Sequence, residues 1–262
     1  MISITDFNFF CWVTLADSEK YLNEAFALAL SLKKVNTMYP LYIIIPNTFS
    51  NHPKYQEFLQ IKDKYLSNVF VLEKPALSFR DDHIGFASTI NKFYCIELLE
   101  KYNKVCFVDS DVIFYKNYDH IFFFEENNNN LKASWRPARD GNGNEESICG
   151  DVMVFCQDHK HLLDYVKQHA LEYNQDETVV NELFYNTKRC SFFKDDIRFD
   201  NSQFTIHDAG YPKTFSYFTN FESIVELFDS RTVDEIRQLI DLFIDTYKRC
   251  YCERVLEANF NT

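Results

Sequence analysis

The sequence predicts an α/β fold with a mostly parallel central sheet flanked by helices, on three observations. Short apolar runs alternate with helical patterns as far as Val108, an order typical of βαβ units. The chain has 262 residues, enough for one large domain that buries a sizeable core. Only 5 Gly and 6 Pro occur, which excludes collagen-like and low-complexity classes.

The N-terminal half contains the βαβ units in order. A buried strand is predicted where a short apolar run such as LYIII occurs, and a helix where apolar residues recur at helical spacing. Asp17 or Ser18 stands where the N-cap of the first helix is expected. The predicted strands are Phe9–Leu15, Leu41–Ile45, Asn68–Leu72 and Lys104–Val108. The predicted helices are Tyr21–Val35, His52–Tyr65 and Thr89–Lys101.

The pattern is less regular after Asp109. Polar residues predict a turn at Asn127–Asn130 and a loop at Arg139–Ser147. The predicted strands are Ala133–Trp135, Val152–Phe155 and Thr205–His207. The predicted helices are Leu162–Glu172, Asp176–Phe184 and a tail from Ser223 onward, in two stretches that are broken near Ser230.

The C-terminal tail carries an apolar stripe at helical spacing. Two readings are open: the stripe packs on the rest of the domain, or it forms the interface of a homodimer. The stripe consists of Ile236, Leu239, Ile240, Phe243, Ile244 and Tyr247.

Charge and hydropathy limit the partners of the chain. The formal net charge is -12, which argues against nucleic acid or an anionic membrane as the main partner. No apolar stretch reaches 18 residues, so no membrane span is expected. The N-terminus has neither the basic region nor the small-residue cleavage site of a secretory signal.

The cysteine pattern predicts thiols rather than disulfides. The eight cysteines are irregularly spaced, and several lie in apolar runs such as KVCFVD, where Cys packs as a small hydrophobe. No CxxC pair occurs, which disfavours a cysteine zinc site. A reducing compartment fits best, and we therefore expect a cytoplasmic protein.

The strongest candidate for chemistry is Asp109-Ser110-Asp111, which ends the apolar run VCFV. In an open parallel sheet, ligands bind beyond the carboxyl ends of the strands. Two carboxylates at this spacing can converge on one hard cation, which in turn bridges a diphosphate. The alternative is an Asp-rich turn in which one side chain caps a helix.

Two further segments carry candidate residues. In the segment IHDAGYPK, His207 can supply a third metal ligand, Gly210 allows close approach to a phosphate, and Lys213 can donate to its oxygens. Asp176 and Glu177 open a helix and can place a carboxylate at a reacting centre. Each of these residues has a structural alternative. His207 could be a hydrogen-bonded residue of the fold and Lys213 a solvated surface charge, and the two acids could interact favourably with the dipole of the helix that they open.

The order of these segments resembles glycosyltransferase family 8, the glycogenin-like group, over roughly Phe10 to Phe215. HDAGYPK fits the family's HxxGxxK in every fixed position. The other segments that carry the resemblance are VTLADSEKYLNEAFALALSL, KVCFVDSDVIFYKNYDHIF, CGDVMVF and DETVVNELF, with Asn91-Lys92 between the first two. The resemblance implies a GT-A nucleotide-sugar-binding fold over residues 1–215, with residues 216–262 as a helical extension packed on it.

The resemblance also implies roles for individual residues. Mn²⁺ would be bound by Asp109, Asp111 and His207. The uridine would be held by Leu15, Asp17, Ser18 and Tyr21. The diphosphate and sugar of the donor would be contacted by Arg80, Lys92, Ser110, Gly150, Asp151, Gly210 and Lys213. The catalytic residues would be Asp176, Glu177 and Lys213.

The chain departs from the family pattern in several respects. The usual Asn-Ser-Gly reads Cys149-Gly150-Asp151, which replaces an amide that contacts the sugar and leaves the sugar's identity open. The usual Asp-Gln reads Asp176-Glu177, which adds a charge. No tyrosine matches the acceptor tyrosine of glycogenin-like proteins.

The expected reaction is transfer of a hexose from a UDP-sugar to a carbohydrate or protein acceptor, with retention at the anomeric carbon. By resemblance to glycogenin, the acceptor could be the chain itself. One rival is a phosphohydrolase, because FVDSDVIF is similar to the haloacid-dehalogenase pattern. The other rival is a binding protein or scaffold that holds a UDP-sugar without turnover. A dependence on UDP would distinguish the transferase from the phosphohydrolase. Turnover of the sugar would distinguish it from the binding protein.

Overall fold

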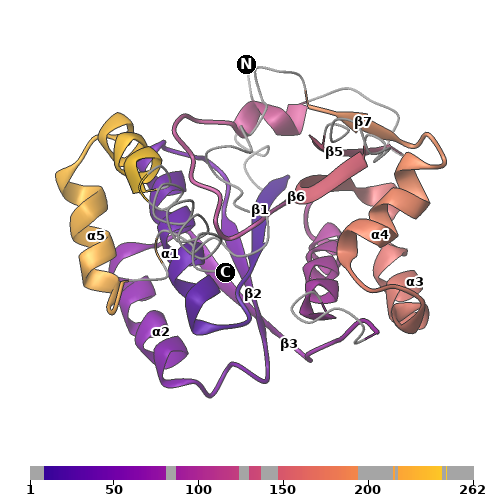
Figure 1. The fold of residues 1–262 in the computed structure, drawn as a ribbon, viewed down its shortest axis with the longest axis horizontal. Helices are drawn as coiled ribbons and strands as arrows, with labels where there is room; N and C mark the ends of the chain where they lie inside the picture. Colours follow the sequence, from indigo (N-terminus) through magenta and orange to yellow (C-terminus); the bar gives the residue numbers. More distant parts are fainter. Residues whose placement is uncertain are drawn as a thin grey trace, which may run out of the picture.

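The computed structural model describes residues 9–80, 87–123, 130–136, 147–193, 215, 218–243 and 246. A seven-stranded sheet runs through this part of the chain in the order β3-β2-β1-β4-β6-β5-β7 (Figure 1). The strands are β1 (Phe10–Leu15), β2 (Leu41–Pro46), β3 (Val69–Lys74), β4 (Lys104–Val108), β5 (Leu131–Arg136), β6 (Ser147–Cys156) and β7 (Cys190–Phe192).

The sheet is mostly parallel, as the sequence predicts. Strands β3, β2, β1 and β4 pair in parallel, and β5 pairs in parallel with β7. Strand β6 pairs antiparallel with both β4 and β5, so it runs against its neighbours. As a result, the beginning of β6 passes the carboxyl end of β4, where ligands are expected.

Helices cover both faces of the sheet and enclose two cores (Figure 1). Residues of β1 alternate between these cores, because Trp12 packs on one face while Cys11 and Val13 pack on the other. The helices of the first face are α1 (Glu19–Lys34), α2 (Pro53–Tyr65) and α5 (Phe221–Ser230). Those of the second face are η2 (Ala87–Glu100), α3 (Leu162–Gln168) and α4 (Asp176–Val180).

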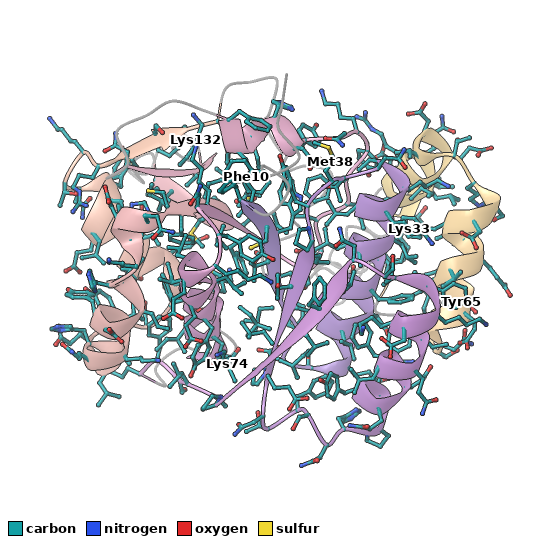
Figure 2. The ribbon with its side chains drawn as sticks, turned by 180° about the vertical axis from the view of Figure 1, so that it is seen from behind. Phe10, Lys33, Met38, Tyr65, Lys74 and Lys132 are labelled. Atoms are coloured by element: carbon teal, nitrogen blue, oxygen red, sulfur yellow. The ribbon has the colours of Figure 1, made fainter. Side chains whose placement is uncertain are left out.

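Helices α1 and α2 lie side by side, and Lys33 Nζ near the end of α1 donates to the carbonyl of Tyr65 at 3.0 Å (Figure 2). Helix α2 begins as its sequence predicts, since His52 Nδ1 accepts from the N–H of Lys54 and Pro53 takes the first helical position. Ser18 occupies the N-cap of α1 but makes no side-chain capping hydrogen bond.

The described strands and helices agree with most of the predicted elements, and three predicted helices differ in their geometry or length. The predicted helix Thr89–Lys101 is present as η2, which has 3-10 turns. The predicted helix Leu162–Glu172 is interrupted after α3, and a separate 3-10 turn follows as η5 (Ala170–Glu172). The predicted helix Asp176–Phe184 changes after α4 into the π-helical η6 (Asn181–Tyr185).

Three differences concern the strands. The predicted Val152–Phe155 is the second half of the longer β6, so Ser147 begins a strand rather than ending a loop. The predicted Ala133–Trp135 extends over β5. Strand β7 was not predicted, because three residues show no periodicity.

Residues 127–129, 139–146, 205–207, Ile244 and Tyr247 lie outside the described residues. The remaining short elements are η3 (Asp119–Phe123) and η4 (Gln157–His159).

The C-terminal helical segment is fastened to α1 and α2. The N–H of Phe215 donates to Glu24 Oε1 at 2.8 Å, and Asn23 Nδ2 donates to the carbonyl of Phe218 at 2.9 Å. Lys54 Nζ donates to the carbonyl of Thr219 at 2.9 Å and lies 4.3 Å from the ring centroid of Phe221. These contacts fix the start of α5 on the first core.

The described part of the apolar stripe lies against the same core. Ile236 and Ile240 are 1% and 5% exposed, and Phe243 packs against the same core, whereas Leu242 is 58% exposed. Six cysteines fall in the described ranges, and none of them forms a disulfide. Burial raises the pKa of the Cys11, Cys95 and Cys106 thiols, so these cysteines serve as small apolar side chains.

Among the described helices, none has the length and apolar character that a bilayer crossing requires.

Phe221→Ala is expected to lower the free energy of unfolding by about 3–5 kcal/mol, because Phe221 is fully buried against Phe26 and Phe58. Urea denaturation measures this change, with Leu242→Ala as the matched control, for which the change is within about 0.5 kcal/mol. Equal stability of the two variants would show that α5 is not integral to the fold.

Candidate active site

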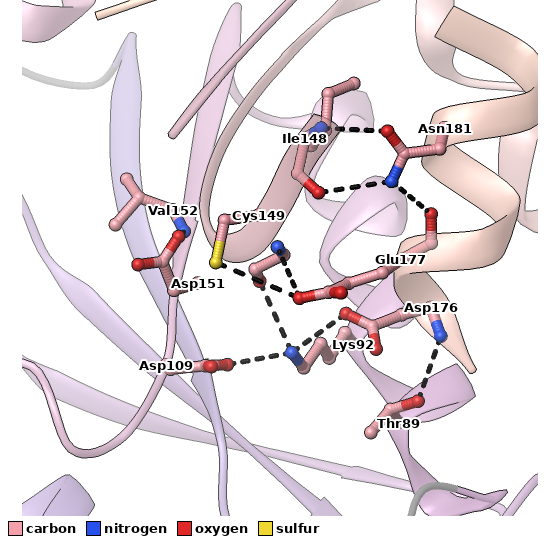
Figure 3. A network of polar contacts seen from close by, with 11 residues as sticks. Thr89, Lys92, Asp109, Ile148, Cys149, Asp151, Val152, Asp176, Glu177 and Asn181 are labelled. Carbon is pink, nitrogen blue, oxygen red and sulfur yellow. Dashed lines mark hydrogen bonds and ion pairs between the residues drawn. The ribbon is translucent and has the colours of Figure 1, made fainter. Parts of the chain in front are cut away.

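A buried lysine joins two aspartates at the carboxyl end of β4. Lys92 Nζ, from η2, lies 2.9 Å from Asp109 Oδ1 and 2.9 Å from Asp176 Oδ2 (Figure 3). Lys92, Asp109 and Asp176 are 8%, 7% and 3% exposed. The same Nζ donates to the carbonyl of Gly150 at 3.3 Å and lies 5.3 Å from the ring centroid of Phe107. One ammonium group therefore ties η2 to β4, β6 and α4.

The charge of Lys92 is maintained by its partners. Burial alone lowers the pKa of the Lys92 ammonium, but attraction to Asp109 and to Asp176, with a hydrogen bond to each carboxylate, outweighs burial. The net shift of its pKa is upward, so Lys92 is a cation at neutral pH. An ion pair this deeply buried holds only because its geometry and hydrogen bonds compensate for desolvation.

Strand β6 is irregular where it passes this cluster. Ala133 pairs with Met153 but the next residue, Ser134, pairs with Cys149, so Gly150 to Val152 have no partner in β5. This bulge brings Gly150 against α4. A Cβ atom at position 150 would clash with Asp176 Oδ2. Glycine therefore lets β6 approach Asp176 without displacing its carboxylate.

Helix α4 is fixed to β6 and to η2 by its first residues. Glu177 Oε1 accepts from the N–H of Gly150 at 3.4 Å and from the thiol of Cys149 at 3.8 Å. The N–H of Asp176 donates to Thr89 Oγ1 at 3.1 Å. Asp176 therefore faces Lys92 and Glu177 faces β6, and their place at a reacting centre stays a prediction.

The Asp-Ser-Asp segment lies directly after β4 and is buried. Ser110 and Asp111 are 5% and 9% exposed. The N–H of Asp109 donates to the carbonyl of Asp151 at 2.8 Å, which joins this segment to β6. The Asp151 side chain is 0% exposed, and its Oδ1 accepts from the N–H of Val152 at 3.0 Å.

The residues present fit a hard divalent cation. Asp109 and Asp111 offer carboxylate oxygens, the ligands that such cations prefer. The Lys92 ammonium against Asp109 shows that this place already stabilises positive charge. No trio of His, Cys, Asp or Glu side chains in the described ranges is arranged as a metal site, and the third predicted ligand, His207, lies outside those ranges.

The residues predicted to hold the nucleotide lie at the end of β1 and the start of α1. Leu15, Asp17, Ser18 and Tyr21 are all half-buried there. Arg80 is exposed, and its backbone N–H donates to the carbonyl of Tyr173 at 3.1 Å. Within the described residues, the Lys92 cluster holds Asp109, Gly150 and Asp176. Gly210 and Lys213 lie outside the described residues.

Sequence reasoning missed two residues that shape the cluster. Thr89 holds the N–H of Asp176, and Asn181 binds the backbone of Ile148 (Figure 3). Each lies one helical turn from a residue that the sequence does single out, Lys92 and Glu177. That spacing was the available signal, but contacts to a distant backbone cannot be read from it.

Comparison with known proteins gives the family to which this fold and site belong. The model of "Glycosyl transferase family 8" matches residues 12–192. The chain belongs to glycosyl transferase family 8. It is 24% identical to glycogenin-1 of Caenorhabditis elegans over 187 residues, which are 67% of this chain and 39% of that glycogenin. The match thus spans less than half of that relative's length.

Two solved structures share the fold. The glycosyltransferase GlyE of Streptococcus pneumoniae TIGR4 has a TM-score of 0.51 at 18% identity, covering 86% of this chain and 64% of that chain. An active-site mutant of LgtC has a TM-score of 0.51 at 13% identity, covering 84% and 95%. The GT-A type of fold, with a mostly parallel sheet flanked by helices and a helical C-terminal segment, is confirmed.

Lys92→Met is expected to destabilise the fold by about 3–5 kcal/mol, because it leaves buried carboxylates without their cation. The pKa of Lys92 is raised in the folded protein. Its contribution to the free energy of unfolding is therefore complete below the ordinary lysine pKa of about 10.4 and is lost as the pH rises through the raised value. Urea denaturation at neutral pH measures the loss.

The matched control is Lys74→Met, which removes the more exposed Lys74–Glu97 pair and costs about 1 kcal/mol or less. A Lys92→Met variant no less stable than this control would contradict the structural importance of the cluster.

Proposed function

We propose that this chain is a metal-dependent, retaining glycosyltransferase that moves a hexose from a UDP-sugar to a carbohydrate or protein acceptor. The observation that carries the proposal is the buried cluster at the end of β4. It links Asp109 of the Asp-Ser-Asp segment, through Lys92, to Asp176 on α4. Membership of family 8 makes sugar transfer the chemistry to be explained.

Asp109, Asp111 and His207 are the residues that would hold the cation, which we propose to be Mn²⁺. When bound, it supplies Lewis-acid stabilisation of the negative charge that grows on the departing UDP. The charges of the site support this assignment, because acidic side chains outnumber the single described lysine of the cluster. A protein of net charge -12 needs local positive charge, here supplied by the proposed cation, to bind a diphosphate.

The donor is proposed to lie across the carboxyl ends of β1 and β4. Leu15, Asp17, Ser18 and Tyr21 contact the uridine in this proposal, at the half-buried start of α1. Gly210 and Lys213, assigned from the sequence motif, contact the diphosphate, and Lys213 stabilises the departing oxygen. Ser110, Gly150 and Asp151 complete the donor side, with Arg80 as an outer basic contact.

The carboxylates of α4 are proposed to act electrostatically. Asp176 is paired with Lys92, and Glu177 accepts from the backbone of Gly150, so both are engaged in contacts that orient them. This supports stabilisation of a cationic sugar or orientation of the acceptor, with attack on the face from which UDP leaves. A covalent glycosyl-enzyme on either carboxylate is the less favoured route.

The acceptor and the location complete the proposal. The name glycogenin-1 on a relative makes the chain itself one acceptor to test. The described cysteines form no disulfides, and this supports a cytoplasmic setting. We propose that a homodimer, if the chain forms one, uses the part of the apolar stripe that the first core does not cover.

The first test is UDP release from a panel of UDP-sugars, with Mn²⁺ and then with EDTA, while the intact mass of the protein is followed. We expect Mn²⁺-dependent release with one preferred sugar. Added hexose mass would identify self-glycosylation, and an unchanged mass with release would indicate water or another acceptor.

No release with any donor, metal and candidate acceptor would overturn the transferase proposal. Thermal stabilisation by UDP and Mn²⁺ without turnover would then favour the binding-protein alternative. Phosphate release from a phosphate ester without UDP would favour the phosphohydrolase, although membership of family 8 opposes it.

Asp176→Asn is expected to lower turnover about a hundredfold or more while UDP affinity changes little, because the carboxylate is proposed to act on the reacting sugar. Steady-state kinetics and UDP binding measure the two effects. Asp158→Asn, an exposed acid at the far end of β6, is the control. Unchanged turnover in Asp176→Asn would refute the assigned role.

A further inference from the structure

The start of β6 extends past the strand beside it. Strand β4 ends at Val108, opposite Val152, so Ile148 and Gly150 lie beyond its last residue. Side chains bind the backbone of these two residues instead: Asn181 at Ile148, and Glu177 and Lys92 at Gly150. Backbone groups at the end of a ladder need such partners, and these side chains therefore determine where β6 stands against α4.

Asn181 makes the most complete of these contacts. Its Oδ1 accepts from the N–H of Ile148 at 2.8 Å, and its Nδ2 donates to the carbonyl of Ile148 at 3.1 Å and to the carbonyl of Glu177 at 2.8 Å (Figure 3). Three of the four hydrogen-bonding capacities of the amide are used. Only a side chain with both an acceptor and donors can bind the two backbone groups of one residue in this way.

Asn181 also stands where the helix changes its geometry. Helix α4 ends at Val180, and η6 begins at Asn181 with π-type turns, since the N–H of Asn186 donates to the carbonyl of Asn181 at 2.9 Å. Such turns recur at functional sites. The amide therefore fastens the helix to β6 at the point where its own ladder changes register.

We propose that Asn181 is a positioning residue of the transferase reaction, an inference that rests on the proposed function. It holds α4 at the spacing from β6 at which Asp176 meets Lys92. On its inner side α4 already lies close to β6, since a Cβ atom at position 150 would clash with Asp176 Oδ2. Outward movement is resisted by the Asn181 amide, so Asp176 is held from both sides.

The second helix of the cluster is fastened by the same device. Asn91, adjacent to Lys92 on η2, accepts from the N–H of Leu77 at 2.9 Å and donates to the carbonyl of Leu77 at 3.0 Å. Each charged group that α4 and η2 contribute thus has an asparagine amide nearby that binds both backbone groups of a neighbouring segment. The repetition supports a positioning role rather than an incidental contact.

The test is the kinetics of Asn181→Leu, which is similar in size but makes no hydrogen bonds. We expect kcat to fall about a hundredfold, as a small misplacement of a reacting group does, with little change in the KM for the UDP-sugar. Asn220→Ala removes the N-cap of α5, which packs on the opposite face of the sheet from α4 and η2, and is the control for lost stability. It is expected to lower the melting temperature without changing kcat.

A double variant separates positioning from stability. If Asn181 acts through Asp176, then Asp176→Asn combined with Asn181→Leu is no slower than Asp176→Asn alone. The inference would be overturned if the losses in kcat of the two single variants multiply in the double variant, or if Asn181→Leu has a normal kcat. Either result would leave the transferase proposal intact. An inactive wild-type protein would overturn the proposed function itself.

A second variant covers the case in which Asn181→Leu does not fold. Asn181→Asp keeps the size and the acceptor but loses the donors to the carbonyls of Ile148 and Glu177. We expect kcat to fall at similar KM, by less than in the leucine variant. A kcat equal to that of the wild type in the folded aspartate variant would overturn the inference.

Discussion

The ion pairs of Lys92 are the interaction on which the candidate site depends. A buried ammonium is unfavourable unless carboxylates meet it at short range, and Asp109 and Asp176 do so from different elements. The pairing therefore fixes η2, β4 and α4 relative to one another, and the contact with Gly150 adds β6. The acidic residues at the strand end are held in place by a cation of the chain itself, although the chain as a whole is strongly acidic.

The parallel half of the sheet could be predicted from the sequence, because β1, β2 and β4 are continuous apolar runs between helices of regular spacing. The start of β6 could not. Ile148 to Asp151 include a glycine and an acid, which favour a loop, and they form a strand because side chains of η2, α4 and η6 bind their backbone. Nothing in the sequence of η2 explains its 3-10 turns.

The charged members of the site could also be predicted. Asp109, Lys92 and Asp176 stand at strand ends or in segments that resemble the family, and the structure brings these three together. Thr89 and Asn181 could not, because their partners are backbone groups of segments distant in the chain, and such contacts leave no pattern in sequence. The positions of His207 and Lys213 relative to this cluster remain proposals from the sequence motif.

The separation of these contacts along the chain has a consequence for folding. Lys92 and Gly150 are 58 residues apart, and Thr89 and Asp176 are 87 apart. Contacts this distant form only after large loops close, so they raise the contact order and slow folding. Lys92 cannot be desolvated favourably before β6 and α4 have docked. We therefore expect the charged cluster to form late in folding, once η2, β4, β6 and α4 have come together.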